Sequence, residues 1–167
     1  MTLHELNTLK KPELHDALAR CCGSEAWIQK MIPFFPADDL VELLEDAEEQ
    51  WYKCTGEDWK EAFTHHPKIG DIESVKNKFA STEVWATTEQ SSVNTATRKV
   101  LEKLASDNRA YEEKFGYIFI VCATGKSAEE MLQLLEVRLK NDPATEIEVA
   151  ADEQNKITKL RLEKLIE

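Results

Sequence analysis

The chain has 167 residues, of which 42% are hydrophobic, and a formal net charge of −11. This length fits one domain with an ordinary buried core, and so acidic a chain argues against a nucleic-acid surface, because phosphate contacts need clustered Lys and Arg. The acidic residues are interspersed along helical stretches, so we interpret them as solvating surface.

The first third of the chain repeats apolar residues at helical spacing. Pro12 can begin a helix that Gly23 would end. Ser24 can cap the next, short helix, and Asp38 or Asp39 can open a longer one whose apolar stripe ends at Trp51. After an interruption at Gly56, a short amphipathic turn over 59–63 leads into a His-His-Pro stretch.

The second half predicts three more helices around one apolar run. The first helix covers Ser91 to Asp107, Ser127 and Glu130 can form a capping box for the second, and the last begins at about Pro143. The run YIFIVCA, residues 117–123, has the pattern of a buried strand but no sheet to join. We therefore predict an all-α fold: a single compact helical domain over residues 1–167, with a buried extended segment near residues 117–123.

Cysteine usage and targeting signals favour the cytoplasm. The four cysteines are Cys21, Cys22, Cys54 and Cys122. They form no CxxC pair and no zinc-type spacing, so reduced, buried thiols are the favoured interpretation. No run approaches the roughly 18 apolar residues that a membrane helix needs. The N-terminal stretch lacks an apolar signal core, and the final LEKLIE is not a peroxisomal signal. We expect a cytoplasmic protein without a membrane partner.

The stretch AFTHHPKIGD, residues 62–71, is the first candidate site. Adjacent histidines on regular structure face apart, and the spacing to Asp71 and Glu73 matches no established metal-ligand pattern, so no metal is predicted. A residue that precedes proline is pushed out of the helical region. His66 would therefore sit on a fixed corner, where an imidazole can serve as an acid or base near neutral pH. A solvent-facing loop histidine is the alternative.

Two further stretches can bind a small polar ligand. In TTEQSS, Glu89 and Gln90 can belong to a capped first helical turn or can hold a urea-like ligand through paired hydrogen bonds. In KITKLRLEKLIE, Arg161 shares a face with Ile157, Leu160 and Leu165, where a guanidinium needs an anionic partner. That partner is either an internal acid or a bound carboxylate. Arg138 is a similar but weaker case.

Taken together, these stretches resemble the OHCU decarboxylases, enzymes that act on 2-oxo-4-hydroxy-4-carboxy-5-ureidoimidazoline (OHCU) in the conversion of urate to allantoin. The matching pieces follow one another in family order: CCGSEAW, HPKIG, EQ, NRAYEEKFGYIFIVCA, EVRL and KITKLRLEKL. The resemblance implies an all-helical fold, a homodimer, no cofactor, and His66 as the catalytic acid–base residue.

The resemblance also implies the substrate contacts. The segment leading to Glu89 and Gln90 matches substrate-binding positions of the family, and our hypothesis is that these two residues hold the ureido arm and orient His66, with Glu89 as the second catalytic residue. The other implied substrate-binding residues are Pro67, Phe119, Ile120, Val121 and Arg161. Two alternatives stay open at this point: a cofactor-free lyase or hydrolase for another ureide, and a non-catalytic helical interaction module.

Overall fold

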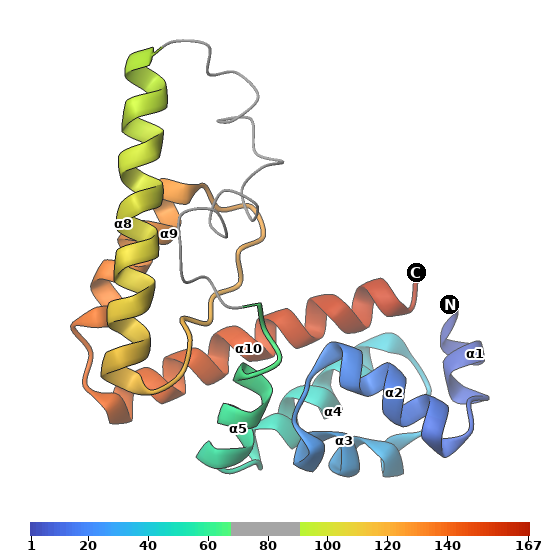
Figure 1. Ribbon diagram of the computed structural model, residues 1–167. Helices are drawn as coiled ribbons and strands as arrows, with labels where there is room; N and C mark the ends of the chain where they lie inside the picture. Colours follow the sequence, from blue (N-terminus) through green and yellow to red (C-terminus); the bar gives the residue numbers. More distant parts are fainter. Residues whose placement is uncertain (68–90) are drawn as a thin grey trace. The chain divides into compact units, whose positions relative to one another are not determined.

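The computed structural model describes residues 1–67 and 91–167, and the side chains of the second range from Thr97 onward. Regular structure within these ranges is helical, without a strand, so the all-α prediction is confirmed. The chain divides into two compact units. Figure 1 shows the helices coloured by residue number. Unit 1 comprises Met1–His66, Ile120–Cys122 and Ile147–Glu167, and unit 2 comprises Pro67–Phe119 and Ala123–Glu146. The single-domain organisation stays a prediction.

Unit 1 is built from short helices and most of one long helix. They are α1 (Leu3–Asn7), α2 (Lys11–Cys21), α3 (Glu25–Met31), the 3-10 turn η1 (Ile32–Phe34), α4 (Leu40–Tyr52), α5 (Gly56–Phe63) and, from residue 147 onward, α10 (Pro143–Leu165). The side chains of Ser24 and Asp39 accept hydrogen bonds from the first turns of α3 and α4, as predicted. Thr55 caps α5, so Gly56 begins that helix rather than interrupting it.

Two buried tryptophans tie the helices of unit 1 together. The indole N–H of Trp27 on α3 donates to the carbonyl of Ala47 on α4 at 3.0 Å, and that of Trp51 on α4 donates to the carbonyl of Ala151 on α10 at 2.9 Å. Both rings are fully buried. Each ring thus combines a large apolar contact with a satisfied polar atom: Trp27 joins α3 to α4, and Trp51 joins α4 to α10.

The buried face of α10 differs from the predicted one. Ile157, Leu160, Arg161 and Leu165, which the spacing grouped into an apolar stripe, are all half-buried. The fully covered face instead carries Ala151, Gln154, Asn155, Thr158 and Leu162. The sequence pattern failed here because the buried face is partly polar, and hydrophobic periodicity cannot detect such a face.

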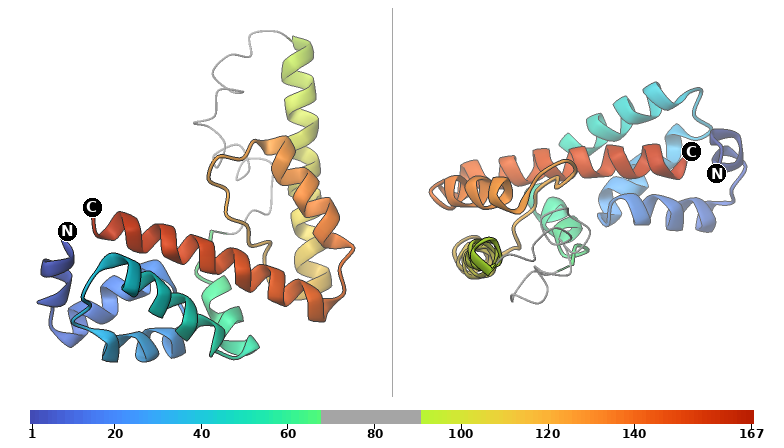
Figure 2. Two further views of the ribbon diagram at one scale, coloured as in Figure 1. Left: turned by 180° about the vertical axis from the view of Figure 1, so that it is seen from behind. Right: turned by 90° about the horizontal axis from the view of Figure 1, so that it is seen from above.

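Unit 2 contains α8 (Ser91–Phe115), α9 (Ala128–Leu139) and the first turn of α10. Helices α8 and α9 pack side by side, as both views in Figure 2 show. The predicted end of the first of these helices at Asp107 was too early, since α8 continues for two further turns to Phe115. Gly116 ends it with a positive φ of 82°, a conformation that favours glycine.

The segment over residues 117–123 has no regular secondary structure and is mostly buried. Its buried side chains are those of Tyr117, Phe119, Ile120, Val121 and Cys122. The predicted buried extended segment is therefore confirmed. Along the described ranges, no helix combines the length and the apolar character needed to cross a membrane.

Candidate functional site

His66 lies just beyond the end of α5, on the corner that the His-Pro pair predicts. Helix α5 ends at Phe63, and the backbone amide of His66 donates to the Phe63 carbonyl at 3.4 Å in the turn that follows. The imidazole is half-buried, and its Nε2 atom lies 2.5 Å from Oε1 of Gln154 on α10. A loop histidine that faces only solvent does not fit this contact with a fully buried amide.

The residue that holds His66 belongs to a polar stripe along α10. Gln154, Thr158 and Arg161 follow the i, i+4, i+7 spacing that places side chains on one helical face. The Gln154 amide nitrogen donates to the Thr158 hydroxyl at 3.1 Å. Seven residues of helix separate Gln154 from Arg161 by about 10 Å along the axis. One stripe therefore carries both the partner of His66 and the candidate anion-binding arginine.

The Cys-Cys-Gly segment after α2 contacts both parts of this arrangement. The carbonyl of Cys21 accepts a long hydrogen bond of 3.4 Å from Nη1 of Arg161. A Cβ atom at Gly23 would lie 2.3 Å from Cγ of the His65 ring, so only glycine allows this approach. The segment thus braces both the His65–His66 corner and the stripe on α10.

Burial keeps the two thiols of this segment protonated. It raises the pKa of Cys21 to about 11, which the charge of Arg161 partly opposes. It raises the pKa of Cys22 to about 12, against hydrogen bonds from the backbone of Ser24 and the side chain of Thr158. All four cysteines are free and buried, as predicted. With their pKa values raised in this way, Cys21 and Cys22 are poor nucleophiles and serve as packing residues.

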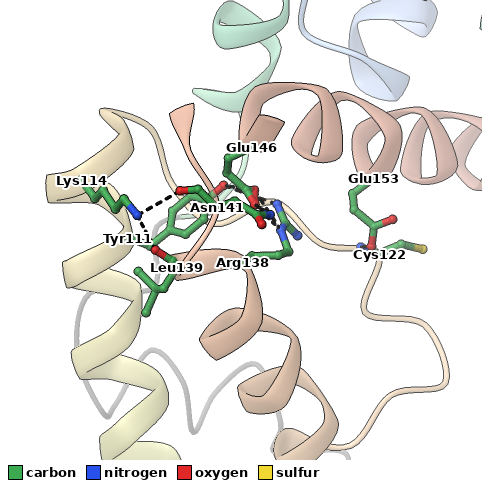
Figure 3. Close-up of polar contacts among 8 residues, drawn as sticks. All are labelled: Tyr111, Lys114, Cys122, Arg138, Leu139, Asn141, Glu146 and Glu153. Atoms are coloured by element: carbon green, nitrogen blue, oxygen red, sulfur yellow. Dashed lines mark hydrogen bonds and ion pairs between the residues drawn. The ribbon is translucent and has the colours of Figure 1, made fainter. Parts of the chain in front are cut away.

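A buried glutamate on α10 anchors the extended segment within unit 1. The backbone N–H of Cys122 donates to Oε1 of Glu153 at 3.3 Å, a contact drawn in Figure 3. The other carboxylate oxygen accepts from the ammonium of Lys156 at 2.6 Å. Ile120 and Val121, two of the predicted substrate contacts, precede Cys122 and are buried in the same unit. Glu153 therefore fixes the backbone at the end of that pair.

The two arginines that looked alike in sequence have different surroundings. Arg138 on α9 is buried and forms an ion pair with the fully buried Glu146, its Nε lying 2.9 and 3.0 Å from the two carboxylate oxygens (Figure 3). Its partner is an internal acid. Arg161 is half-buried, and no carboxylate of the described residues lies within ion-pair distance of it. In the described part of the chain, the internal-acid alternative thus holds for Arg138 alone.

The buried pair in unit 2 lies within an aromatic cluster that includes another predicted contact residue. The Arg138 guanidinium lies 4.5 Å from the ring centre of Phe119, and the Tyr111 hydroxyl donates to Glu146 at 2.9 Å. Burial raises the pKa of the Tyr111 phenol well above its usual range, so this hydroxyl stays a donor. Phe119 packs edge-on against Tyr111 at 5.3 Å between ring centres. We interpret this cluster as structural support for the start of the extended segment.

The described structure does not test the remaining predicted site residues. Pro67 is exposed and belongs to unit 2. Glu89 and Gln90 lie outside the described residues, as do Asp71 and Glu73. Among the described residues, no group of three or more His, Cys, Asp or Glu side chains lies close enough together to bind a metal. Sequence reasoning missed Glu153 and Gln154, since neither belongs to a recognisable motif.

Comparison with known proteins identifies the family. A family model for OHCU decarboxylase matches residues 7–163. The chain belongs to the OHCU decarboxylase family. A crystal structure of OHCU decarboxylase in the presence of (S)-allantoin superposes on this member of the family with a TM-score of 0.71 and 37% identity, over 90% of this chain and 97% of the other.

Curated relatives of this OHCU decarboxylase family member include longer proteins. The uric acid degradation bifunctional protein TTL of Arabidopsis thaliana is 40% identical over 149 residues, which are 87% of this chain and 45% of that protein. An OHCU decarboxylase of Amia calva is 43% identical over 60 residues, 36% of this chain and 34% of that protein. The chain thus spans less than half the length of these two relatives. An OHCU decarboxylase of Haloferax volcanii is 24% identical over 97% of this chain and 94% of its own length.

Proposed function

We propose that this protein catalyses the decarboxylation of OHCU to (S)-allantoin and CO2, a step in urate degradation. The observation that carries the proposal is the match to an OHCU decarboxylase structure obtained in the presence of (S)-allantoin, which covers nearly the full length of both chains. The family membership favours this reaction over the two alternatives, another ureide reaction and a non-catalytic module.

The substrate itself can accept the electrons that the reaction releases. When CO2 leaves, its bonding electron pair forms a ring C=C bond while the neighbouring C=N bond opens and its nitrogen takes a proton. The hydroxyl then loses its proton and becomes a carbonyl, and the adjacent ring carbon takes a proton on one face. This route needs no separate electron sink of the kind that pyridoxal or thiamine provides elsewhere. The protein must orient the substrate and transfer protons.

His66 is the proposed proton-transfer residue, and its environment in unit 1 supports this role. The His-Pro turn and the bond to Gln154 restrict the position of the ring. A positioned acid or base of this kind contributes typically 10²- to 10⁴-fold to a rate. Glu89, which would orient His66, completes the proposed catalytic pair.

Arg161 is the proposed anion-binding residue. Its guanidinium makes one long bond to a backbone carbonyl and has no carboxylate partner among the described residues. A half-buried arginine in this state can offer a two-pronged grip to a carboxylate or carbonyl of the substrate. The backbone at Ile120 and Val121, held through Glu153, would bind ring oxygens, while Pro67, Gln90 and Phe119 are the remaining proposed contacts.

The roles of the two neighbouring histidines can be separated directly. We expect His66→Ala to fold normally and to lose at least about 100-fold in OHCU turnover, because it removes the proton-transfer group. His65→Ala is the matched control: it deletes an adjacent, exposed imidazole and should keep most of the activity. Equal turnover by the His66→Ala variant and the wild type would remove His66 from the mechanism.

We further propose that residues 1–167 act as one family domain, that the protein is a cytoplasmic homodimer, and that it binds neither nucleic acid nor membranes. The match of the family model to residues 7–163 supports the first point, and the net charge of −11 supports the absence of a nucleic-acid partner. The dimer rests on the family resemblance. Light scattering coupled to gel filtration tests it, and a monomer mass at micromolar concentration would contradict it.

A further inference from the structure

Glu153 on α10 is a buried acid outside the proposed catalytic pair. Only 9% of the residue is exposed. A buried carboxylate is costly unless hydrogen bonds or a cation compensate it, and an apolar side chain could fill the same space without that cost. The two printed partners of this carboxylate, the backbone N–H of Cys122 and the ammonium of Lys156, therefore indicate its role.

The ion pair with Lys156 does not explain why Glu153 is buried. The carboxylate oxygen Oε2 lies 2.6 Å from the Lys156 ammonium, three residues further along the same helix. The Lys156 side chain is 63% exposed, and an ion pair with so exposed a cation contributes little to stability. A glutamate on the solvent face of α10 could form such a pair as well. The ion pair thus engages one oxygen but does not require the buried position.

The contact with Cys122 does require it. The other oxygen, Oε1, accepts a hydrogen bond of 3.3 Å from the backbone N–H of Cys122, as Figure 3 shows. Cys122 is buried in a segment without regular secondary structure, where a backbone N–H needs an acceptor from outside its own segment. The carboxylate supplies the bond that a neighbouring strand would supply in a sheet. Because this bond is already long, it depends on the full length of the glutamate side chain.

Consecutive residues of α10 therefore hold two separate parts of the proposed site. Glu153 binds the end of Ile120–Cys122, and Gln154 lies 2.5 Å from the His66 ring. All of these residues belong to unit 1. Consecutive side chains leave a helix about 100° apart, so neither residue can take over the contact of the other. One turn of helix thus sets the spacing between the extended segment and the His66 corner.

We infer that Glu153 is a positioning residue, which holds the backbone of Ile120–Cys122 at the distance from His66 at which that backbone binds the substrate. The reach of the side chain, rather than its charge, carries this role. The inference rests on the proposed function for its effect on catalysis. Its structural part, the anchoring of Cys122, can be measured without any turnover.

Three variants of Glu153 separate reach from charge. Glu153→Met removes the acceptor oxygen, Glu153→Asp keeps the charge on a shorter side chain, and Glu153→Gln keeps the length and an acceptor oxygen without the charge. Amide hydrogen exchange measured by NMR reports the Cys122 N–H directly. We expect this amide to exchange at least about 10-fold faster in the Met and Asp variants and near the wild-type rate in the Gln variant. The amide of Leu162, fully buried on the same helix, is the internal control and should stay unchanged, because the loss is local.

Steady-state kinetics test the positioning role. We expect KM for OHCU to rise about 3- to 10-fold in Glu153→Met and Glu153→Asp, and to stay near the wild-type value in Glu153→Gln. A purely structural defect would lower the amount of folded enzyme and hence the apparent kcat, but would leave KM unchanged. Lys156→Met is the matched control: it removes the ion pair but keeps the acceptor for Cys122, so exchange and KM should both stay near wild type.

Three results would overturn the inference. Wild-type exchange of the Cys122 amide in the Met and Asp variants would contradict the anchor. Faster exchange with an unchanged KM would contradict the positioning role. A Gln variant that matches the Asp variant would show that charge, and not reach, matters, and this pair decides the question even where Glu153→Met does not fold. Failure of the proposed function looks different: the wild type would then not accelerate OHCU decarboxylation, while the exchange data would still decide the anchor.

Discussion

Removing the buried guanidinium of Arg138 should destabilise the protein strongly. Glu146 is fully buried and accepts hydrogen bonds from Arg138 and from Tyr111. Arg138→Met keeps a long apolar side chain but leaves the buried carboxylate without its cation, a change that typically costs about 3–5 kcal/mol. The lost contact with the face of Phe119 adds roughly 0.5–1 kcal/mol. We expect the free energy of unfolding to fall by about 4 kcal/mol.

Urea denaturation followed by circular dichroism measures this loss. For a chain of this size, about 4 kcal/mol corresponds to a fall in Tm of roughly 8–16 °C. Lys140→Met is the matched control: Lys140 is exposed just beyond α9, so its loss should change stability by no more than about 0.5 kcal/mol. Combining Arg138→Met with Glu146→Gln removes the unpaired charge and should recover at least about 2 kcal/mol. A loss of unfolding free energy below about 1 kcal/mol in Arg138→Met would refute this reasoning. So would a double variant whose loss is as large as the losses of the two single variants added together.

Three further predictions concern unit 1. In Gly23→Ala the new Cβ atom would lie only 2.8 Å from the Cβ of His65 and closer still to its ring, so His65 must move. Turnover should therefore fall about 10- to 100-fold, and adding His65→Gly should restore part of it. Since the pKa of Cys22 is raised from 9.0 to about 12, its stabilising contribution is present below pH 9 and decreases as the pH rises toward 12. Wild type should therefore lose stability more steeply than Cys22→Ser between pH 9 and 11, and equal slopes would argue against a buried neutral thiol. Arg161→Lys keeps the charge but loses the two-pronged geometry, so KM for OHCU should rise about 10-fold, whereas unchanged kinetics would make this arginine structural.

The helix starts could be predicted because the capping residues carry local information. Ser24, Asp39 and Ser127 each accept a hydrogen bond from the backbone N–H three residues on, as their positions before apolar runs indicate. The end of α8 could not be found in the same way. Tyr111 and Phe115 continue the helix because they pack on each other, with ring centres 4.6 Å apart, and such packing is invisible to local pattern.

The candidate site was only partly predictable for a related reason. His66 is marked by the following proline and Arg161 by its apolar neighbours, so the sequence could single both out. The sequence could not say which arginine has an internal acid, because Glu146 meets Arg138 only after the chain has turned from α9 into α10. Gln154 was missed because its importance lies in one long-range contact with His66.

The most direct test of the central claim is circular dichroism of freshly generated OHCU at a wavelength where (S)-allantoin absorbs, with and without the protein. Spontaneous decay gives racemic allantoin and no signal. We predict that the protein produces an (S)-allantoin signal that grows in proportion to enzyme concentration and disappears in His66→Ala. A signal no larger with the protein than without it would contradict the proposed decarboxylase activity.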